Sequence, residues 1–133
     1  MTDAIRAHVG AEWVLEARGA DPARLRSIDV LQALFAEIID TVALTPVGDA
    51  HWHAFPHPGG VTGLQLLAES HLTVHTYPEF ASLCLNLFCC TPRDREATAE
   101  QLARALERQV GPEQVAVRHL VRDYGPLVAT VAS

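Results

Sequence analysis

The residues best suited to chemistry gather in one short stretch, 68–79, which reads AESHLTVHTYPE. This stretch contains Ser70, one of only four serines in the chain, with two histidines and two glutamates. A serine, a histidine and a carboxylate can form a nucleophilic site, in which the imidazole takes the proton of the hydroxyl. The G-x-S-x-G turn of many serine hydrolases is absent, because Glu69 and His71 flank Ser70. A strand whose solvent face carries Ser, Thr and His is the non-catalytic alternative.

A second candidate is a metal site built from histidines. His51, His53 and His57 have the spacing H-x-H-x-x-x-H, and the adjacent Cys89 and Cys90 could join them as ligands. Two prolines crowd the third histidine, and no C-x-x-C pair accompanies it. We therefore expect no metal, although stoichiometric zinc in the purified protein would favour a metal-binding module.

The composition excludes several classes of protein. The chain has 133 residues, of which 49% are hydrophobic, and this predicts a single domain, 1–133, with a real core. A net charge of −6 argues against a nucleic-acid partner. No apolar run is long enough for a membrane span, and no charged-then-apolar leader is visible, so we expect a cytoplasmic protein. All ten basic residues are arginines, which excludes a lysine Schiff base, ordinary pyridoxal-phosphate chemistry and a Walker-type phosphate loop.

Hydrophobic periodicity predicts the elements that must position these residues. The pattern indicates a helix from Asp21-Pro22 to before Pro46, and another that starts at Thr91-Pro92. Strands are expected at 8–16, 61–69, 72–77, 83–89 and 115–120, with a further short candidate at 51–55. The order β-α-β-β-β-α-β predicts an α+β fold: a two-layer sandwich with a mostly antiparallel sheet and two helices on one face. Since the other face also needs cover, we expect a homodimer.

The stretch 69–79, followed by LFCC at 87–90, resembles the prokaryotic S-adenosylmethionine decarboxylase proenzyme family. Upstream, 58–63 (PGGVTG) resembles that family's P-x-G-V-S-G segment, with the hydroxyl of Thr62 retained for a supporting role in processing. By motif and element order the resemblance extends from about His8 to Val121. It implies a decarboxylase of S-adenosylmethionine that supplies aminopropyl groups for spermidine synthesis. The implied cofactor is a covalent pyruvoyl group derived from Ser70, which forms a Schiff base with the substrate without any lysine.

The resemblance also implies self-cleavage between Glu69 and Ser70, giving a β chain of 1–69 and an α chain of 70–133. Ser70 Oγ attacks the Glu69 carbonyl, His75 is the processing base, and Cys90 is the proton donor of the catalytic reaction. Ser70 and His75 are five residues apart, so on a regular strand they point to opposite faces. Either a bulge or turn breaks the strand near the cleavage site, or His75 serves a site completed by another protomer. Such a site suits a homodimer or a dimer of processed α/β pairs.

Two further positions concern the substrate. Glu79 matches the family's glutamate for the ribose hydroxyls, and Phe55 matches the phenylalanine that stacks on adenine if one inserted residue is allowed. An ordinary core residue is the alternative for Phe55. Asn86 and Thr91 stand where the family usually has aspartate and glycine. These departures leave open the same pyruvoyl chemistry on ornithine or arginine, and a non-catalytic dimeric binding homologue is a third hypothesis.

Overall fold

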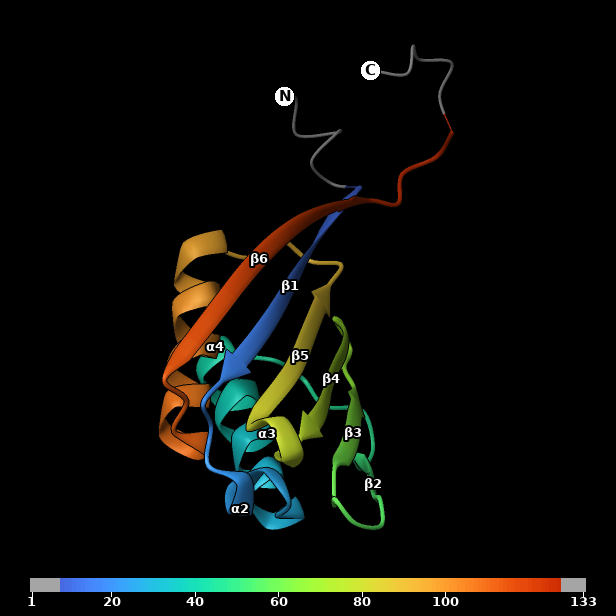
Figure 1. The fold of residues 1–133 in the computed structure, drawn as a ribbon. Coiled ribbons are helices and arrows are strands. Elements are labelled where there is room, and N and C mark those ends of the chain that lie inside the picture. Colours follow the sequence, from blue (N-terminus) through green and yellow to red (C-terminus); the bar gives the residue numbers. More distant parts are fainter. Residues whose placement is uncertain (1–7, 128–133) are drawn as a thin grey trace.

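Six strands form one antiparallel sheet in the computed structural model, which describes residues 8–127 (Figure 1). The spatial order is β2-β3-β4-β5-β1-β6. The strands are β1 (Val9–Arg18), β2 (His51–Ala54), β3 (Val61–Leu66), β4 (Ser70–Tyr77), β5 (Ser82–Cys89) and β6 (Gln114–Asp123). The predicted α+β sandwich is confirmed. Four strands lie between the two long helices where the predicted order has three, because the candidate strand near His51 forms β2 at the sheet edge.

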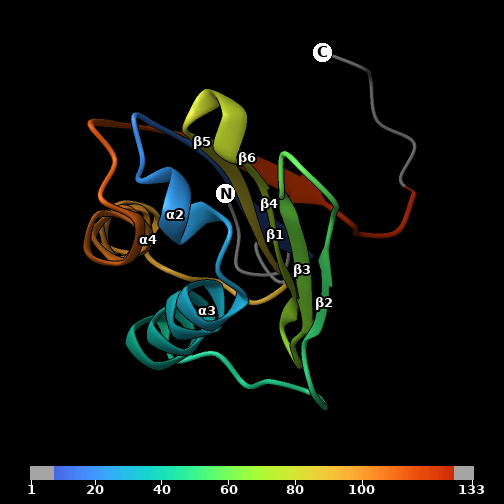
Figure 2. The same ribbon diagram turned by 60° about the horizontal axis from the view of Figure 1, so that its bottom comes forward.

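The helices α2 (Pro22–Leu25), α3 (Ile28–Val42) and α4 (Arg95–Val110) cover one face of the sheet, as Figure 2 shows. The predicted first helix is two helices, because the Ser27 side chain accepts a hydrogen bond from the Val30 N–H and starts α3 anew. The second predicted helix begins later than Thr91-Pro92, since the Asp94 carboxylate caps it. None of the helices described is long and apolar enough to cross a lipid bilayer.

The core lies between the sheet and the helices. Alternate residues of β1, β4 and β5 point toward α3 and α4, as the two-residue period of a strand requires. The largest fully buried side chains are Trp13, Leu15, Leu25, Leu31, Leu34, Ile38, Leu72, Leu83, Leu85, Leu87, Leu102 and Leu106. This packing fixes which residues of β4 are left on the other face.

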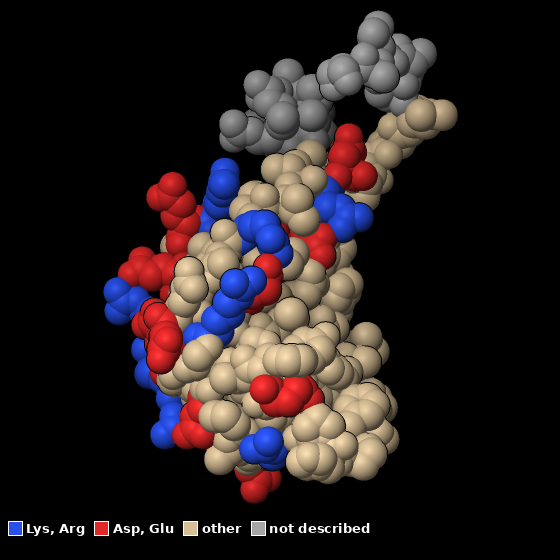
Figure 3. Space-filling model, in the orientation of Figure 1, with Lys and Arg blue, Asp and Glu red and all other residues tan. Residues whose placement is uncertain are grey.

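The sheet face away from the helices bears no helix or strand among residues 8–127 (Figure 2). On β4 this open face carries His71, Thr73, His75 and Tyr77, while the residues between them are buried. Charged side chains gather over α4 and β6 in Figure 3, and the area over β2–β5 is mostly free of them. Between β4 and β5 the register is continuous from Ser70 opposite Cys89 to Tyr77 opposite Ser82. The strand itself therefore contains no bulge.

Candidate active site

Ser70 is the first residue of β4, directly after a bend at residues 68 and 69. Its Cα lies opposite that of Cys89, and the Cys90 N–H donates a 2.8 Å hydrogen bond to the carbonyl oxygen of Glu69. The Ser70 carbonyl in turn accepts from the Leu67 N–H at 2.9 Å. We call this group of Glu69, Ser70 and Cys90 the Ser70 corner. The carbonyl that precedes Ser70 is thus polarised by a backbone donor and held in one orientation.

The Glu69 side chain is fixed from the opposite side. Thr45 donates to its two oxygens, from the backbone N–H at 3.0 Å and from the hydroxyl at 3.1 Å. A guanidinium nitrogen of Arg93 lies 3.8 Å from Glu69 Oε2, and only 13% of the Glu69 side chain is exposed. The Thr45 N–H lowers the pKa of the Glu69 carboxyl against the opposing effect of burial, with further help from the Thr45 hydroxyl and from Arg93. Glu69 is therefore held as a carboxylate.

Arg93 links this carboxylate to the end of α3. It donates to the carbonyls of Val42 and Ala43, the last residue of α3 and its cap. Its Nε is buried and has no hydrogen-bond partner among the residues described. The neighbouring Cys89 is fully buried, and burial raises the pKa of its thiol. Cys89 therefore behaves as a core residue, in contrast to the half-buried Cys90.

The histidine nearest to the Ser70 hydroxyl in this chain is not the predicted one. Nδ1 of His71 lies 3.4 Å from Ser70 Oγ, at the long end of hydrogen-bond distances. The ring of His71 packs at a tilt on Phe88, with centroids 5.6 Å apart. His71 directly follows Ser70 in the sequence, but neighbours on a strand normally point to opposite faces. The sequence alone therefore assigns His71 no role.

His75 lies at the other end of β4, beside the other predicted residues. It is directly opposite Thr62 on β3, and Nδ1 of His75 is 2.5 Å from the Thr62 hydroxyl oxygen. A hollow of about 340 Å³ is lined by His75, Phe55, Tyr77 and Glu79, among others. The rings of His75 and Phe55 are 5.8 Å apart and those of His75 and Tyr77 are 4.6 Å apart. We call this group the His75 hollow.

Phe55 is not part of the core, because 44% of its surface is exposed. The alternative that Phe55 is an ordinary core residue is therefore wrong. Its ring meets that of His53 edge-on at 4.5 Å and faces the same hollow as Glu79, which is exposed on the short 3-10 turn η1 (Pro78–Phe80). Aromatic rings and a carboxylate around one concave surface can bind a planar base and its sugar hydroxyls.

The Ser70 corner and the His75 hollow do not meet within one chain. Five residues of regular strand separate Ser70 from His75, which is about 17 Å at 3.4 Å per residue. The bend at residues 68 and 69 precedes Ser70, so it does not bring His75 closer. Of the two alternatives drawn from the sequence, a break between these residues is excluded. The other alternative, a site to which two copies contribute, stays a prediction.

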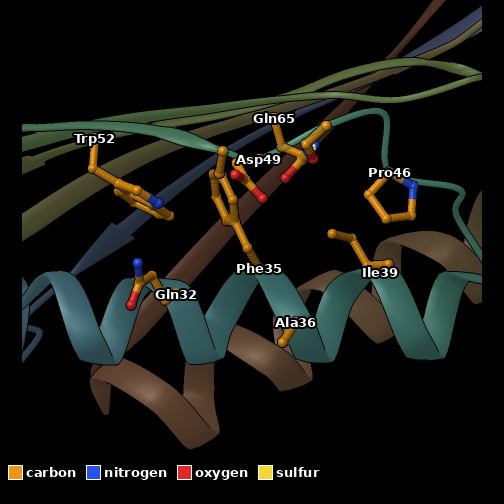
Figure 4. A pocket seen from close by; sticks show the side chains of 10 residues that line it. Gln32, Phe35, Ala36, Ile39, Pro46, Asp49, Trp52 and Gln65 are labelled. Carbon is orange, nitrogen blue, oxygen red and sulfur yellow. Dashed lines mark hydrogen bonds between the residues drawn. The ribbon is translucent and has the colours of Figure 1, made fainter.

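The remaining candidates lie elsewhere. In the described part of the chain no three His, Cys, Asp or Glu side chains are grouped so that they could hold a metal ion. A cavity of about 400 Å³ lies between α3 and the β2–β3 edge, and Figure 4 shows Phe35 and Ile39 below it, with Trp52 and Asp49 above. None of its lining residues belongs to the Ser70 corner or the His75 hollow.

Sequence reasoning missed Thr45 and Arg93, the two partners of the Glu69 side chain. Each lies 24 positions from Glu69, on opposite sides of it in the chain. No local pattern marks them, because their proximity arises from the packing of the loop after α3 and the loop before α4 on the same bend. Only the three-dimensional arrangement identifies them.

Comparison with known proteins gives a consistent result. Residues 11–123 match the family model of S-adenosylmethionine decarboxylase. The S-adenosylmethionine decarboxylase proenzyme of Archaeoglobus fulgidus is 32% identical over 117 residues, which are 88% of this chain and 98% of that protein. A proenzyme of the same name from Prochlorococcus marinus is 31% identical over 92% of this chain and 94% of its own. The crystal structure of the adenosylmethionine decarboxylase from Aquifex aeolicus shares the fold, with a TM-score of 0.72 at 21% identity over 95% of this chain and 98% of that one.

Proposed function

Since the chain belongs to the S-adenosylmethionine decarboxylase family, we propose that it decarboxylates S-adenosylmethionine with a pyruvoyl group made from its own Ser70. The product would supply aminopropyl groups for polyamine synthesis. The absence of lysine from all 133 residues supports this chemistry, because the enzyme then needs an electrophile other than a lysine-bound cofactor.

One observation carries the proposal: the 2.8 Å hydrogen bond from the Cys90 N–H to the Glu69 carbonyl oxygen. Self-cleavage requires the Ser70 hydroxyl to add to this carbonyl, and negative charge then develops on its oxygen. A fixed backbone donor at that oxygen stabilises the charge as an oxyanion hole does, which is typically worth about 3–4 kcal/mol. The same bond continues the β4–β5 ladder by one pair beyond Ser70 and Cys89, so the sheet itself positions the donor.

Self-cleavage then follows from the chain's own groups. The Ser70 Oγ–carbonyl carbon bond forms as the Glu69–Ser70 peptide bond breaks, and the hydroxyl proton passes to the Ser70 nitrogen. Removal of the Ser70 α-proton expels the Glu69 carboxylate and leaves a dehydroalanine at residue 70. Water converts this group to pyruvoyl and releases ammonia. The fragments are the β chain, 1–69, and the α chain, 70–133.

The base for the α-proton comes from a second copy. Within one chain His75 is about 17 Å from Ser70, far beyond hydrogen-bond reach. If a second copy places its His75 hollow beside the Ser70 corner of the first, two-fold symmetry gives a homodimer two equivalent sites. Thr62 supports the proposal, because its hydroxyl fixes the orientation of the His75 ring at the 2.5 Å contact.

In the mature enzyme the pyruvoyl group would bind the substrate amine and accept the electrons released with carbon dioxide. Residues of the same composite site surround it. Cys90 is half-buried next to residue 70, where its thiol can return a proton to the product α-carbon. Phe55 and Glu79 of the partner's hollow would bind the adenine and the ribose hydroxyls. Ornithine and arginine have neither a nucleobase nor a sugar that these two residues could bind.

Mass spectrometry of the purified protein and of its Ser70→Ala variant tests the proposal. We expect two fragments with the masses of 1–69 and 70–133 in the first sample, with a hydrazine-reactive group on the second fragment. Ser70→Ala should remain one inactive chain, whereas Ser82→Ala, a matched change at the first residue of β5, should cleave normally. Carbon dioxide release from S-adenosylmethionine, ornithine and arginine, compared side by side, identifies the substrate. An intact chain in active wild-type protein would refute the proposal.

A further inference from the structure

The bend that contains the scissile bond is held by a row of backbone hydrogen bonds. Residues 45–47 run alongside it as a short ladder, in which the Ala68 N–H donates to Thr45 O at 2.8 Å and the Val47 N–H donates to Leu66 O at 2.9 Å. These contacts fix the backbone up to Ala68. The Glu69 carbonyl is held by the Cys90 N–H, and the Glu69 side chain supplies a further anchor of the scissile peptide.

Both partners of that side chain are themselves well fixed. Thr45 uses its N–H and hydroxyl on Glu69 and its carbonyl on Ala68. Arg93 is 19% exposed, and the two carbonyls at the end of α3 hold its guanidinium against Glu69 Oε2. A largely buried arginine and carboxylate lose much of their hydration, so an arrangement that pairs them restricts Glu69 to one position.

We infer that Thr45 and Arg93 are positioning residues for self-cleavage: by holding the Glu69 side chain they keep its carbonyl on the Cys90 N–H while the Ser70 hydroxyl attacks. The inference rests on the proposed function, because it concerns the same peptide bond. Neither residue touches the reacting atoms. Loss of the anchor lets the peptide plane rotate, and a misplacement of about 1 Å at a reacting centre can cost roughly a hundredfold in rate.

A double-mutant cycle separates this role from simple stabilisation of α3. The full-length chain is synthesised in a cell-free system, and the first-order rate of cleavage is followed by mass spectrometry for wild type, Arg93→Gln, Glu69→Gln and the double variant. Arg93→Gln should slow cleavage roughly ten- to hundredfold in the wild-type background and about twofold or less in the Glu69→Gln background. Arg93→Lys, which keeps the charge, should restore part of the rate.

Controls and a milder variant complete the test. Arg104→Gln breaks an exposed pair with Glu100 on α4 and should leave the cleavage rate unchanged. Thr45→Val removes only the hydroxyl contact and should slow cleavage less than Arg93→Gln does. Its control, Thr41→Val, removes an exposed hydroxyl bond to a helix carbonyl and should leave the cleavage rate unchanged. Melting temperatures show whether each variant is folded.

Three outcomes would overturn the inference. Equal slowing by Arg93→Gln in both backgrounds, in parallel with a lower melting temperature, would assign Arg93 to α3 alone. Wild-type rates in Arg93→Gln and Thr45→Val would remove any role in cleavage. A wild-type chain that never cleaves after Glu69 would refute the proposed function and the positioning role together, whereas the first two results leave the proposed function intact.

Discussion

Two inactive variants should restore one another if the site spans two copies. Ser70→Ala removes the nucleophile from the Ser70 corner, and His75→Ala removes the base from the His75 hollow. These residues are about 17 Å apart along β4, whereas a proton transfer requires roughly 3 Å, so the two groups of one chain cannot react together. Each variant alone should therefore stay uncleaved, but a mixed dimer contains one complete site, built from Ser70 of one chain and His75 of the other.

The expected yield can be calculated from random pairing. When equal amounts of the two variants are co-expressed with different tags, about half of the dimers are mixed, and one of the two sites in each is complete. About a quarter of all chains should then be cleaved, and every cleaved chain should carry the His75→Ala tag. Intact mass spectrometry of the separated tags measures both quantities. His51→Ala, at an exposed histidine on β2, should cleave when it is expressed alone, as a dimer with itself, and controls for the loss of a histidine.

The reasoning fails if the His75→Ala chain cleaves by itself at the wild-type rate. The base would then lie in the same chain, and His71, whose Nδ1 is 3.4 Å from Ser70 Oγ, would be the candidate. Absence of cleavage in purified mixed dimers would equally refute a site shared between His75 of one copy and Ser70 of the other.

Two further predictions follow from the contacts described above. Cys90→Ala removes a thiol but keeps the backbone N–H on the Glu69 carbonyl. Self-cleavage, measured by mass spectrometry, should therefore proceed, while carbon dioxide release should fall by roughly a hundredfold or more. Equal loss of both activities would contradict separate roles for the thiol and the N–H. Hydrogen bonds from Arg108, against opposing burial and with help from Gln109, lower the pKa of the Glu37 carboxyl. Since the folded-state pKa is the lower one, the stabilisation is present above about pH 4.3 and is lost as the pH falls through the folded-state value. Arg108 is 54% exposed, so solvent screening keeps the effect small. The difference in melting temperature between wild type and Glu37→Gln should therefore shrink as the pH falls from about 6 to about 3.5, which crosses the usual glutamate range. A constant difference would contradict this assignment.

Much of the fold could be predicted because local hydrophobic periodicity marks the strands and helices. The alternation in Leu83, Leu85 and Leu87 predicts a half-buried strand, and the structure buries all three on β5. The first residue of each helix was harder to predict, because several nearby residues in the sequence could act as its N-cap. Asp21 caps α2 as predicted, whereas Ser27 caps a second helix, α3, that was not predicted separately. Asp94 takes the place of Thr91 as the cap of α4.

The site could be predicted only where its residues are neighbours in the sequence. Ser70, His75 and Glu79 belong to one continuous motif, and the offset of five correctly predicts that Ser70 and His75 face opposite sides. Thr45 and Arg93 could not be found in this way, because their contact with Glu69 depends on how α3 and α4 end and begin against the sheet. Local sequence patterns specify strands and faces, whereas anchors across loops depend on tertiary packing.

The departure at Asn86 has a local explanation on the open face. Asn86 lies opposite Val14 on β1, and its side-chain amide donates to the Glu12 carboxylate. This hydrogen bond is the largest influence that lowers the pKa of Glu12, which is also paired with Arg122. An aspartate at position 86 would face that carboxylate with a like charge and no donor, at a cost of several kcal/mol if both stayed ionised. The contact with Glu12 therefore accounts for the asparagine, and its presence does not by itself argue for a substrate other than S-adenosylmethionine.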